Sequence, residues 1–151
     1  MSAEVAPAEP AAPVEPAEPA TTRIAAASFL AFDFGTLRVG VASGNTVRGQ
    51  AQPLRTLAVV GDARFKAIRR LIDDWQPDAL VVGVPFHPDG AEHENTLRAR
   101  RFARQLHGRF RLPVHEVDER YTTTEAHAGG ARDLDAASAA IILDQFLRSL
   151  S

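Results

Sequence analysis

The sequence contains no cysteine and no long hydrophobic run. The first absence excludes disulfide bonds and zinc sites with cysteine ligands. A transmembrane helix needs roughly 20 consecutive apolar residues, and no segment approaches that length. We therefore expect a soluble, cytoplasmic protein without a membrane partner.

Lysine is almost absent as well. Lys66 is the only lysine among the 17 basic residues, and all the others are arginines. The guanidinium group offers a fixed fork of donors that suits phosphate recognition. A genomic bias toward arginine codons would give the same composition, so the arginines alone do not indicate a nucleic-acid partner.

Residues 1–27 consist mostly of alanine, proline and glutamate. Prolines at positions 7, 10, 13, 16 and 19 block the hydrogen bonding of helices and sheets, so we expect a disordered, extended tail. The acidic residues and the lack of a long apolar run argue against an export signal or a mitochondrial transit peptide. Residues 28–151 are then expected to form one folded domain.

This domain is predicted to begin with three strands. Ser28–Phe34 and Arg38–Ser43 are separated by only three residues, which allows only an antiparallel hairpin. The third strand is expected at Gln50–Val59, where Pro53 restricts it to a sheet edge or a bulge. The three segments predict an antiparallel meander.

The rest of the domain alternates helices with strands. Apolar residues recur every three or four positions from Asp62 to just before Pro77 and again over Glu92–Phe110, as in amphipathic helices. Ala79–Val84 is apolar throughout, which is typical of a parallel strand covered on both faces. The remaining elements are expected to be a strand at Pro113–Val117, a short helix near Thr123–His127 and a closing helix at Leu134–Leu150. This order predicts an α/β fold in which helices flank a mixed sheet.

Asp33 is the first candidate functional residue, because it lies within the apolar strand Ser28–Phe34. An ionised carboxylate in an apolar setting is costly unless it is paired, hydrogen-bonded or bound to a metal. Side chains alternate along a strand, so Phe32 and Phe34 are expected to point away from Asp33 to the opposite face. Asp33 therefore needs a partner from elsewhere in the chain.

Other carboxylates occur at positions where they could meet Asp33. Asp118 and Glu119 end the last predicted strand, and Asp135 opens the closing helix. Several oxygen ligands at one place suit Mg²⁺ or Mn²⁺, and two such ions support phosphodiester hydrolysis. Each acid also has a simpler interpretation, since Asp135 could cap its helix and Asp118 or Glu119 could pair with Arg120.

Two further segments could contact a ligand. The loop Gly83–Gly90 leaves a buried strand at its carboxyl end, where α/β folds bind ligands, although Asp89-Gly90 also suits an ordinary turn. His87 and His93 lack the partner spacing of a zinc site. The helix after this loop carries a basic stripe that could follow the phosphates of a nucleic acid or could simply face solvent. The helix carries Arg98, Arg100, Arg101 and Arg104, and positions 100, 101 and 104 are expected to share the face that forms the stripe.

Four motifs together resemble those of one protein family. They are Ala31–Thr36 with Val39–Ala42, Val82–Pro85 with Asp89-Gly90, Asp118–Thr123, and Asp135–Leu143. In this order they resemble the YqgF-type, or RuvX-type, Holliday junction resolvases, a family also described as pre-16S ribosomal RNA nucleases. The resemblance covers Phe29 to about Leu147.

The resemblance implies an RNase H-like fold with a five-stranded mixed sheet, and a metal-dependent nuclease that trims the 5′ end of pre-16S rRNA in the cytoplasm. It implies Asp33, Glu119 and Asp135 as catalytic residues that bind two Mg²⁺ or Mn²⁺ ions, with Asp118 as the substitute if Glu119 is not a ligand. Its implied partner is structured RNA of the small-subunit precursor, and we expect a monomer or a weak homodimer. Nucleic-acid contacts are expected from Thr36, Arg98, Arg101, Arg104 and Arg120.

One segment departs from the family's pattern. Tyr121–Leu134 is shorter than is usual and contains no lysine, and Arg132 could supply the missing charge. Two alternative functions stay open, a Holliday junction resolvase acting on branched DNA and an rRNA-binding assembly factor without catalysis. An ATP-binding domain of the sugar-kinase and actin type is disfavoured, because the chain cannot supply the two such domains that close around ATP.

Overall fold

The computed structural model describes residues 27–119 and 133–150. In these residues a five-stranded sheet has the order β3-β2-β1-β4-β5. Neighbouring strands are antiparallel from β1 to β3, whereas β4 is parallel to both β1 and β5. This confirms the predicted mixed sheet. The strands are β1 (Ser28–Phe34), β2 (Val39–Asn45), β3 (Ala51–Leu57), β4 (Ala79–Val84) and β5 (Val114–Asp118).

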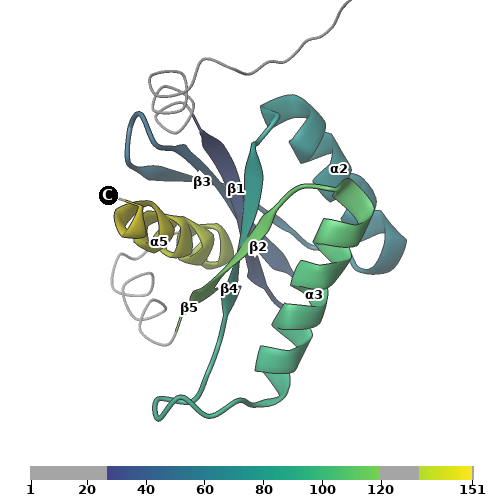
Figure 1. The fold of residues 1–151 in the computed structure, drawn as a ribbon. Helices are drawn as coiled ribbons and strands as arrows, with labels where there is room; N and C mark the ends of the chain where they lie inside the picture. Colours follow the sequence, from purple (N-terminus) through teal and green to yellow (C-terminus); the bar gives the residue numbers. More distant parts are fainter. Residues whose placement is uncertain (1–26, 120–132, 151) are drawn as a thin grey trace, which may run out of the picture.

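Helices cover both faces of the sheet. In the part of the chain that the structure describes they are α2 (Gly61–Trp75), α3 (Glu94–Phe110) and α5 (Leu134–Ser149). Figure 1 shows α2 and α3 on one face and α5 on the other. None of these helices combines the length and the apolar character needed to cross a membrane.

The alternation of side chains along β1 supplies a core on each face. Leu30 and Phe32 are buried in the cluster that packs beneath α2 and α3. Phe29 and Ala31 belong to the separate cluster beneath α5. Asp33 continues the second series, so its side chain lies on the α5 face, opposite to Phe32 as predicted.

The third strand is shorter than predicted. It ends at Leu57, and Val59 and Val60 are exposed in the connection to α2. Pro53 lies on this strand, which is at the edge of the sheet, and it pairs with Ala42 beside an irregularity in the register. The expectation that proline restricts this strand to an edge or a bulge is confirmed.

Helix α3 begins two residues later than predicted because His93 caps it. The N–H of Asn95 donates to His93 Nδ1 at 3.2 Å, and the N–H of His93 donates to the Thr96 hydroxyl at 3.0 Å. Because of this reciprocal capping the helix begins at Glu94, and Glu92 stays in the preceding loop.

Some predictions cannot be compared with the structure. The short helix near Thr123–His127 and the tail at 1–27, apart from Ala27, lie outside the described residues. Most of the segment that departs from the family's pattern, residues 121–132 of Tyr121–Leu134, also lies outside the described residues.

Candidate functional site

The three predicted acids meet at one end of the sheet. Asp33 lies near the carboxyl end of β1, Glu119 directly follows β5, and Asp135 lies in the first turn of α5. The Asp33 and Glu119 side chains share a hydrogen bond, and the charge of Asp135 acts on Asp33. We call these three residues the acid cluster. Its members come from positions far apart in the chain.

Two glycines make room for the acid cluster. Asp33 pairs with Gly40 on β2 and with Gly83 on β4, so it has a glycine on either side across the sheet. A Cβ atom on Gly40 would overlap the carbonyl oxygen of Asp135, and one on Gly83 would lie 3.1 Å from the carboxyl carbon of Glu119. The missing side chains thus admit the start of α5 on one side and the Glu119 carboxyl group on the other.

Burial makes ionisation of the acid cluster costly. Desolvation, followed by the charge of Asp135, raises the pKa of Asp33 to about 7. Desolvation, followed by the charge of Asp33, raises the pKa of Glu119 to about 8. Their shared hydrogen bond lowers the pKa of Asp33 and raises that of Glu119, as expected when protonated Glu119 donates to Asp33. Near neutral pH the pair therefore holds a proton between its two carboxyl groups.

Asp135 has a different partner. Arg38, in the connection between β1 and β2, places its Nε atom 2.9 Å from an Asp135 carboxylate oxygen. The cap of α5 is Asp133, whose side chain accepts hydrogen bonds from the N–H of Ala136 at 3.1 Å and from the hydroxyl of Thr56. The interpretation of Asp135 as a helix cap is therefore wrong, because Asp133 fills that role.

The donor set of the acid cluster suits a hard cation, although its present arrangement is not that of a finished metal site. In residues 27–119 and 133–150, no group of three or more His, Cys, Asp or Glu side chains is spaced to hold a metal ion. Two adjacent buried carboxylates such as Asp33 and Glu119 do not both ionise readily unless a cation neutralises them, and oxygen ligands are those that Mg²⁺ and Mn²⁺ prefer. The chemistry of the residues therefore fits a divalent ion that takes the place of the shared proton.

Three of the predicted nucleic-acid contacts gather in one pocket on the other face of the sheet. Thr36, Arg98 and Arg101 line it, together with Arg64 and Gly61 from the start of α2. Arg120 lies outside the described residues. The role of these residues in binding stays a prediction.

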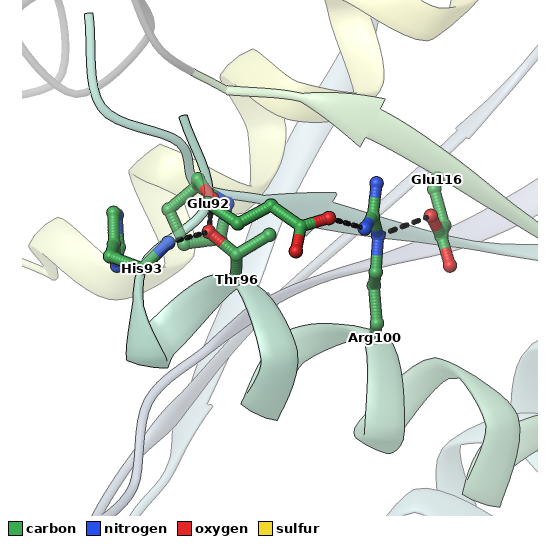
Figure 2. A network of polar contacts seen from close by, with 6 residues as sticks. Glu92, His93, Thr96, Arg100 and Glu116 are labelled. Atoms are coloured by element: carbon green, nitrogen blue, oxygen red, sulfur yellow. Dashed lines mark hydrogen bonds and ion pairs between the residues drawn. The ribbon is translucent and has the colours of Figure 1, made fainter. Parts of the chain in front are cut away.

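The predicted basic stripe is divided in the structure, and its members do not share one face. Arg100 makes ion pairs with Glu92 and, at 3.5 Å, with Glu116 (Figure 2). Arg104 lies on the same side of α3, in a hollow with Glu116, away from Arg101. Arg100 thus pairs with two carboxylates from other segments, whereas Arg98 pairs only with Glu94 of its own helix and Arg101 makes no ion pair among the described residues. The positive charge available for phosphates is therefore greater on the side of Arg98 and Arg101.

The network in Figure 2 also fixes the loop between β4 and α3. The Thr96 hydroxyl donates to the carbonyl oxygen of Pro85 and accepts from the N–H of His93. Arg100 holds Glu92 through an ion pair. His93 thus acts as a helix cap, and its ring lies against that of His87 with 4.6 Å between the centroids. This loop is anchored to both α3 and β5.

Some residues of the site were not found by sequence reasoning. Arg38 and Arg64 received no role, and Gly40 and Gly83 were noted only as parts of motifs. A signal was present for the glycines, because each interrupts a run of valines in a buried strand, in Val39-Gly40-Val41 and Val82-Gly83-Val84. Glycine weakens a strand and often marks a close approach by another segment. The two arginines gave no comparable signal.

Comparisons with known proteins find relatives that match most of the chain. The model of the family RuvX, described as Holliday junction resolvase, matches residues 27–149. A protein of Polaromonas sp. is 68% identical over 123 residues, covering 82% of this chain and 89% of the relative. A protein of Albidiferax ferrireducens is 69% identical over 123 residues, covering 82% of this chain and 79% of the relative. Both relatives are named "Putative pre-16S rRNA nuclease".

A solved structure shows the same fold. "T. thermophilus RuvC in complex with Holliday junction substrate" aligns with a TM-score of 0.52 at 16% identity, covering 82% of this chain and 95% of that chain. The likeness confirms the expected RNase H-like fold and extends to nearly the full length of the other protein.

Proposed function

The chain belongs to the RuvX family, and on that premise we propose that it is a divalent-metal-dependent nuclease that processes the 5′ end of pre-16S rRNA. The observation that carries the proposal is the acid cluster, in which Asp33 from β1 and Glu119 after β5 share a hydrogen bond at the end of the sheet where Asp135 begins α5. The names of the relatives support a ribosomal RNA precursor as the substrate. Such a substrate would be met in the cytoplasm.

The residues of the acid cluster would act as the ligands of the divalent ions. Asp33, Glu119 and Asp135 would coordinate two Mg²⁺ or Mn²⁺ ions, and Asp118 is the substitute for Glu119. When bound, the ions supply a water of lowered pKa and neutralise charge on the phosphate. Glu119 must lose its proton for this to happen, and the Asp135 oxygen that Arg38 does not contact is available to an ion. The Arg38 side chain is 64% exposed beside the acid cluster, where it would also face the negatively charged substrate.

The pocket on the opposite face positions the nucleic acid. Thr36, Arg98 and Arg101 would contact phosphates, and Arg120 would join them from the segment after β5. Arg104 would contribute less, because it lies beside Glu116 on the other side of α3. The partner in this proposal is structured RNA of the small-subunit precursor, bound by a monomer or a weak homodimer.

Cleavage of a precursor 16S substrate in Mn²⁺ tests the proposal. We expect products from the wild type, and at least a hundredfold slower cleavage by Asp33→Asn, because the amide removes one anionic ligand. Asp74→Asn, at the exposed end of α2, is the matched control and should cleave at the wild-type rate. Equal rates for wild type and Asp33→Asn would show that the acid cluster is not the catalytic site.

A second candidate is a resolvase that cuts branched DNA. It is favoured by the description of the family model, Holliday junction resolvase. Side-by-side cleavage of the RNA precursor and of a four-way DNA junction distinguishes the two functions. A third outcome, tight rRNA binding with no cleavage of either substrate, would identify a non-catalytic assembly factor instead.

A further inference from the structure

A pocket of about 320 Å³ lies at the same end of the sheet as the acid cluster, beneath α2 and α3 on the opposite face. Its polar lining is dominated by three arginines, with Thr36 and Gly61 beside them. We call it the arginine pocket and define it by Thr36, Gly61, Arg64, Arg98 and Arg101. Neither Arg64 nor Gly61 has a role in the catalytic proposal.

Arg64 is a buried cation without a carboxylate partner. The residue is only 6% exposed, and within the described residues none of the ion pairs involves it. Its Nε donates to the carbonyl oxygen of Val59 at 3.0 Å, and its Nη2 donates to that of Thr36 at 3.1 Å. The guanidinium group also lies 5.6 Å from the centroid of the Phe34 ring.

These contacts orient the Arg64 side chain but do not neutralise it. Its Nη1 has no acceptor among the described residues, although guanidinium groups in protein interiors are normally paired or fully hydrogen-bonded. Desolvation lowers the pKa of Arg64, which reflects the cost of the uncompensated charge. An anion in the pocket would reduce that cost.

The start of α2 adds backbone donors to the same pocket. The helix begins at Gly61, which has φ 61°, and its N-cap residue Val60 makes no side-chain hydrogen bond to the first turn. The first N–H groups of a helix point outward and carry partial positive charge, so an uncapped start favours an anion. Gly61 is itself part of the pocket lining.

Arg98 and Arg101 complete the positive lining from α3. Arg101 is exposed and makes no ion pair in the part of the chain that the structure describes. Arg98 contacts Glu94 at 2.7 Å, with the Glu94 side chain 74% exposed. Such a surface pair contributes little and exchanges readily. Three guanidinium groups are thus offset by one solvent-exposed carboxylate.

We propose that the arginine pocket binds a phosphodiester of the nucleic-acid strand whose neighbouring segment is cleaved at the acid cluster. The proposal rests on the proposed nuclease function, which already gives Thr36, Arg98 and Arg101 phosphate contacts, and it adds the buried guanidinium group of Arg64 and the backbone at Gly61 as the groups that bind the phosphodiester. Thr36 follows Asp33 by three residues, so their Cα atoms lie within about 11 Å of each other. A strand that crosses the β1–β2 connection therefore reaches both sites within a few nucleotides.

Equilibrium binding in EDTA tests the pocket without any cleavage. The probe is a fluorescein-labelled single-stranded RNA oligonucleotide, and the variants are Arg98→Gln and Arg101→Gln, both on the surface of α3. Each is expected to weaken binding 3- to 10-fold and to reduce the slope of log Kd against log salt by about 0.7, the value for one phosphate contact on a single strand. Arg48→Gln, in the turn after β2, is the matched control.

The outcomes separate a pocket from general electrostatics. Equal losses for Arg48→Gln and Arg101→Gln, or unchanged slopes for both pocket variants, would overturn the proposal. Arg64→Gln is a poor test, since it also removes the bonds to Val59 and Thr36 and the fold could suffer. The binding experiment therefore relies on the surface variants Arg98→Gln and Arg101→Gln.

The NMR signals of backbone amides and arginine side chains in the wild type show where the phosphodiester of the oligonucleotide binds. The Gly61 amide and the Arg64 Nε–H are expected to shift when the oligonucleotide is added, with smaller shifts in Arg101→Gln. Shifts with inorganic phosphate but not with the oligonucleotide would assign the pocket to a free anion and overturn the proposal. None of these measurements needs catalysis. If the oligonucleotide does not bind in the arginine pocket, the cleavage result for Asp33→Asn still stands. If the protein does not cleave the precursor, the binding result still stands.

Discussion

The backbone of Asp135 lies directly against Gly40, so closely that a Cβ atom at position 40 would overlap the Asp135 carbonyl oxygen. Both partners in this contact are backbone, which cannot swing aside as the end of a side chain can. Gly40 is also the residue that pairs with Asp33 across β1 and β2. The position of α5 relative to the acid cluster is therefore set by the absence of a side chain on β2.

Gly40→Ala is expected to displace the start of α5. We expect the free energy of unfolding to fall by about 1–3 kcal/mol, the usual cost of overpacking, and cleavage to fall with the displaced Asp135. Chemical denaturation and the precursor cleavage assay measure the two effects. Gly108→Ala is the control, because a Cβ at this helical position meets nothing within 4 Å, and it should be neutral or slightly stabilising. Wild-type stability in Gly40→Ala would contradict the contact.

Gly83→Ala should separate stability from activity. The added methyl group would overlap Cδ1 of Ile142 and would also press on the Glu119 carboxyl group. Combining it with Ile142→Val removes the first conflict and is expected to recover part of the lost stability, as measured by urea denaturation. Cleavage should stay low in the double variant because Glu119 is still displaced. Recovery of both properties together would show that the methyl group does not disturb Glu119.

The sequence was most informative about elements whose pattern is local. The exact bounds of β1 and β4 and the edge position of Pro53 follow from apolar runs and proline chemistry, which depend on near neighbours. The two-residue error at the start of α3 came from His93, because histidine is not among the residues usually expected to cap a helix. Propensity did not indicate that its ring would accept the Asn95 N–H.

The acid cluster was proposed from the sequence, whereas its surroundings were not. Asp33 is conspicuous as a charge in an apolar strand, and the positions of Asp118, Glu119 and Asp135 at the ends of elements made them candidate partners. The family resemblance then selected Glu119 and Asp135. The contact of Arg38 with Asp135 and the isolation of Arg64 depend on how β1, α2 and α5 pack, which no local pattern encodes. The division of the arginines on α3 likewise depends on Glu92 and Glu116, which come from other elements.

The metal-free protein should lose stability as the pH rises from 5 to 8. Asp33 and Glu119 have ordinary pKa values of 3.8 and 4.5, and burial raises them to about 7 and about 8 in the folded protein. The folded state therefore binds more protons than the unfolded state in this range, so the free energy of unfolding falls with increasing pH. The stabilisation is complete below the ordinary pKa values of 3.8 and 4.5 and is lost as the pH passes the raised values.

Asp33→Asn provides the matched variant for this pH effect. An amide cannot ionise, so in EDTA the variant should lose less stability than the wild type between pH 5 and 8, with a difference of at least about 1.4 kcal/mol, the equivalent of one pKa unit. Denaturation curves at several pH values give the comparison. Parallel pH profiles for the two proteins would show that the buried pair is not the source.

Mn²⁺ should stabilise the protein at pH 8, where its carboxylate ligands are easiest to deprotonate. An ion at 100 times its Kd stabilises the folded state by about 2.7 kcal/mol, which thermal unfolding detects readily. The shift should disappear in Asp33→Asn and in Glu119→Gln and persist in Asp74→Asn. An equal shift in all four proteins would indicate binding elsewhere on the surface.

Arg38→Gln is expected to tighten the binding of Mn²⁺. Its ion pair with Asp135 is partly exposed, with side-chain exposures of 64% and 30%, so its loss should change stability by less than about 1 kcal/mol. Removing a positive charge beside the ion should lower the Kd about fivefold, the effect of roughly 1 kcal/mol. Calorimetric titration measures the change against Arg48→Gln. A weaker affinity in Arg38→Gln would mean that Arg38 supports the ion site instead of competing with it.

The distribution of the acid cluster along the chain has a consequence during protein synthesis. A nascent chain that has emerged only through β5 carries Asp33 and Glu119 but lacks Asp135, and the sheet face that contains Phe29 and Ala31 has no helix to cover it. Domains fold from the amino-terminal side as they leave the ribosome. The acid cluster therefore cannot be complete until α5 has been translated and has docked on the sheet, so the last helix of the chain controls when all three acids first meet.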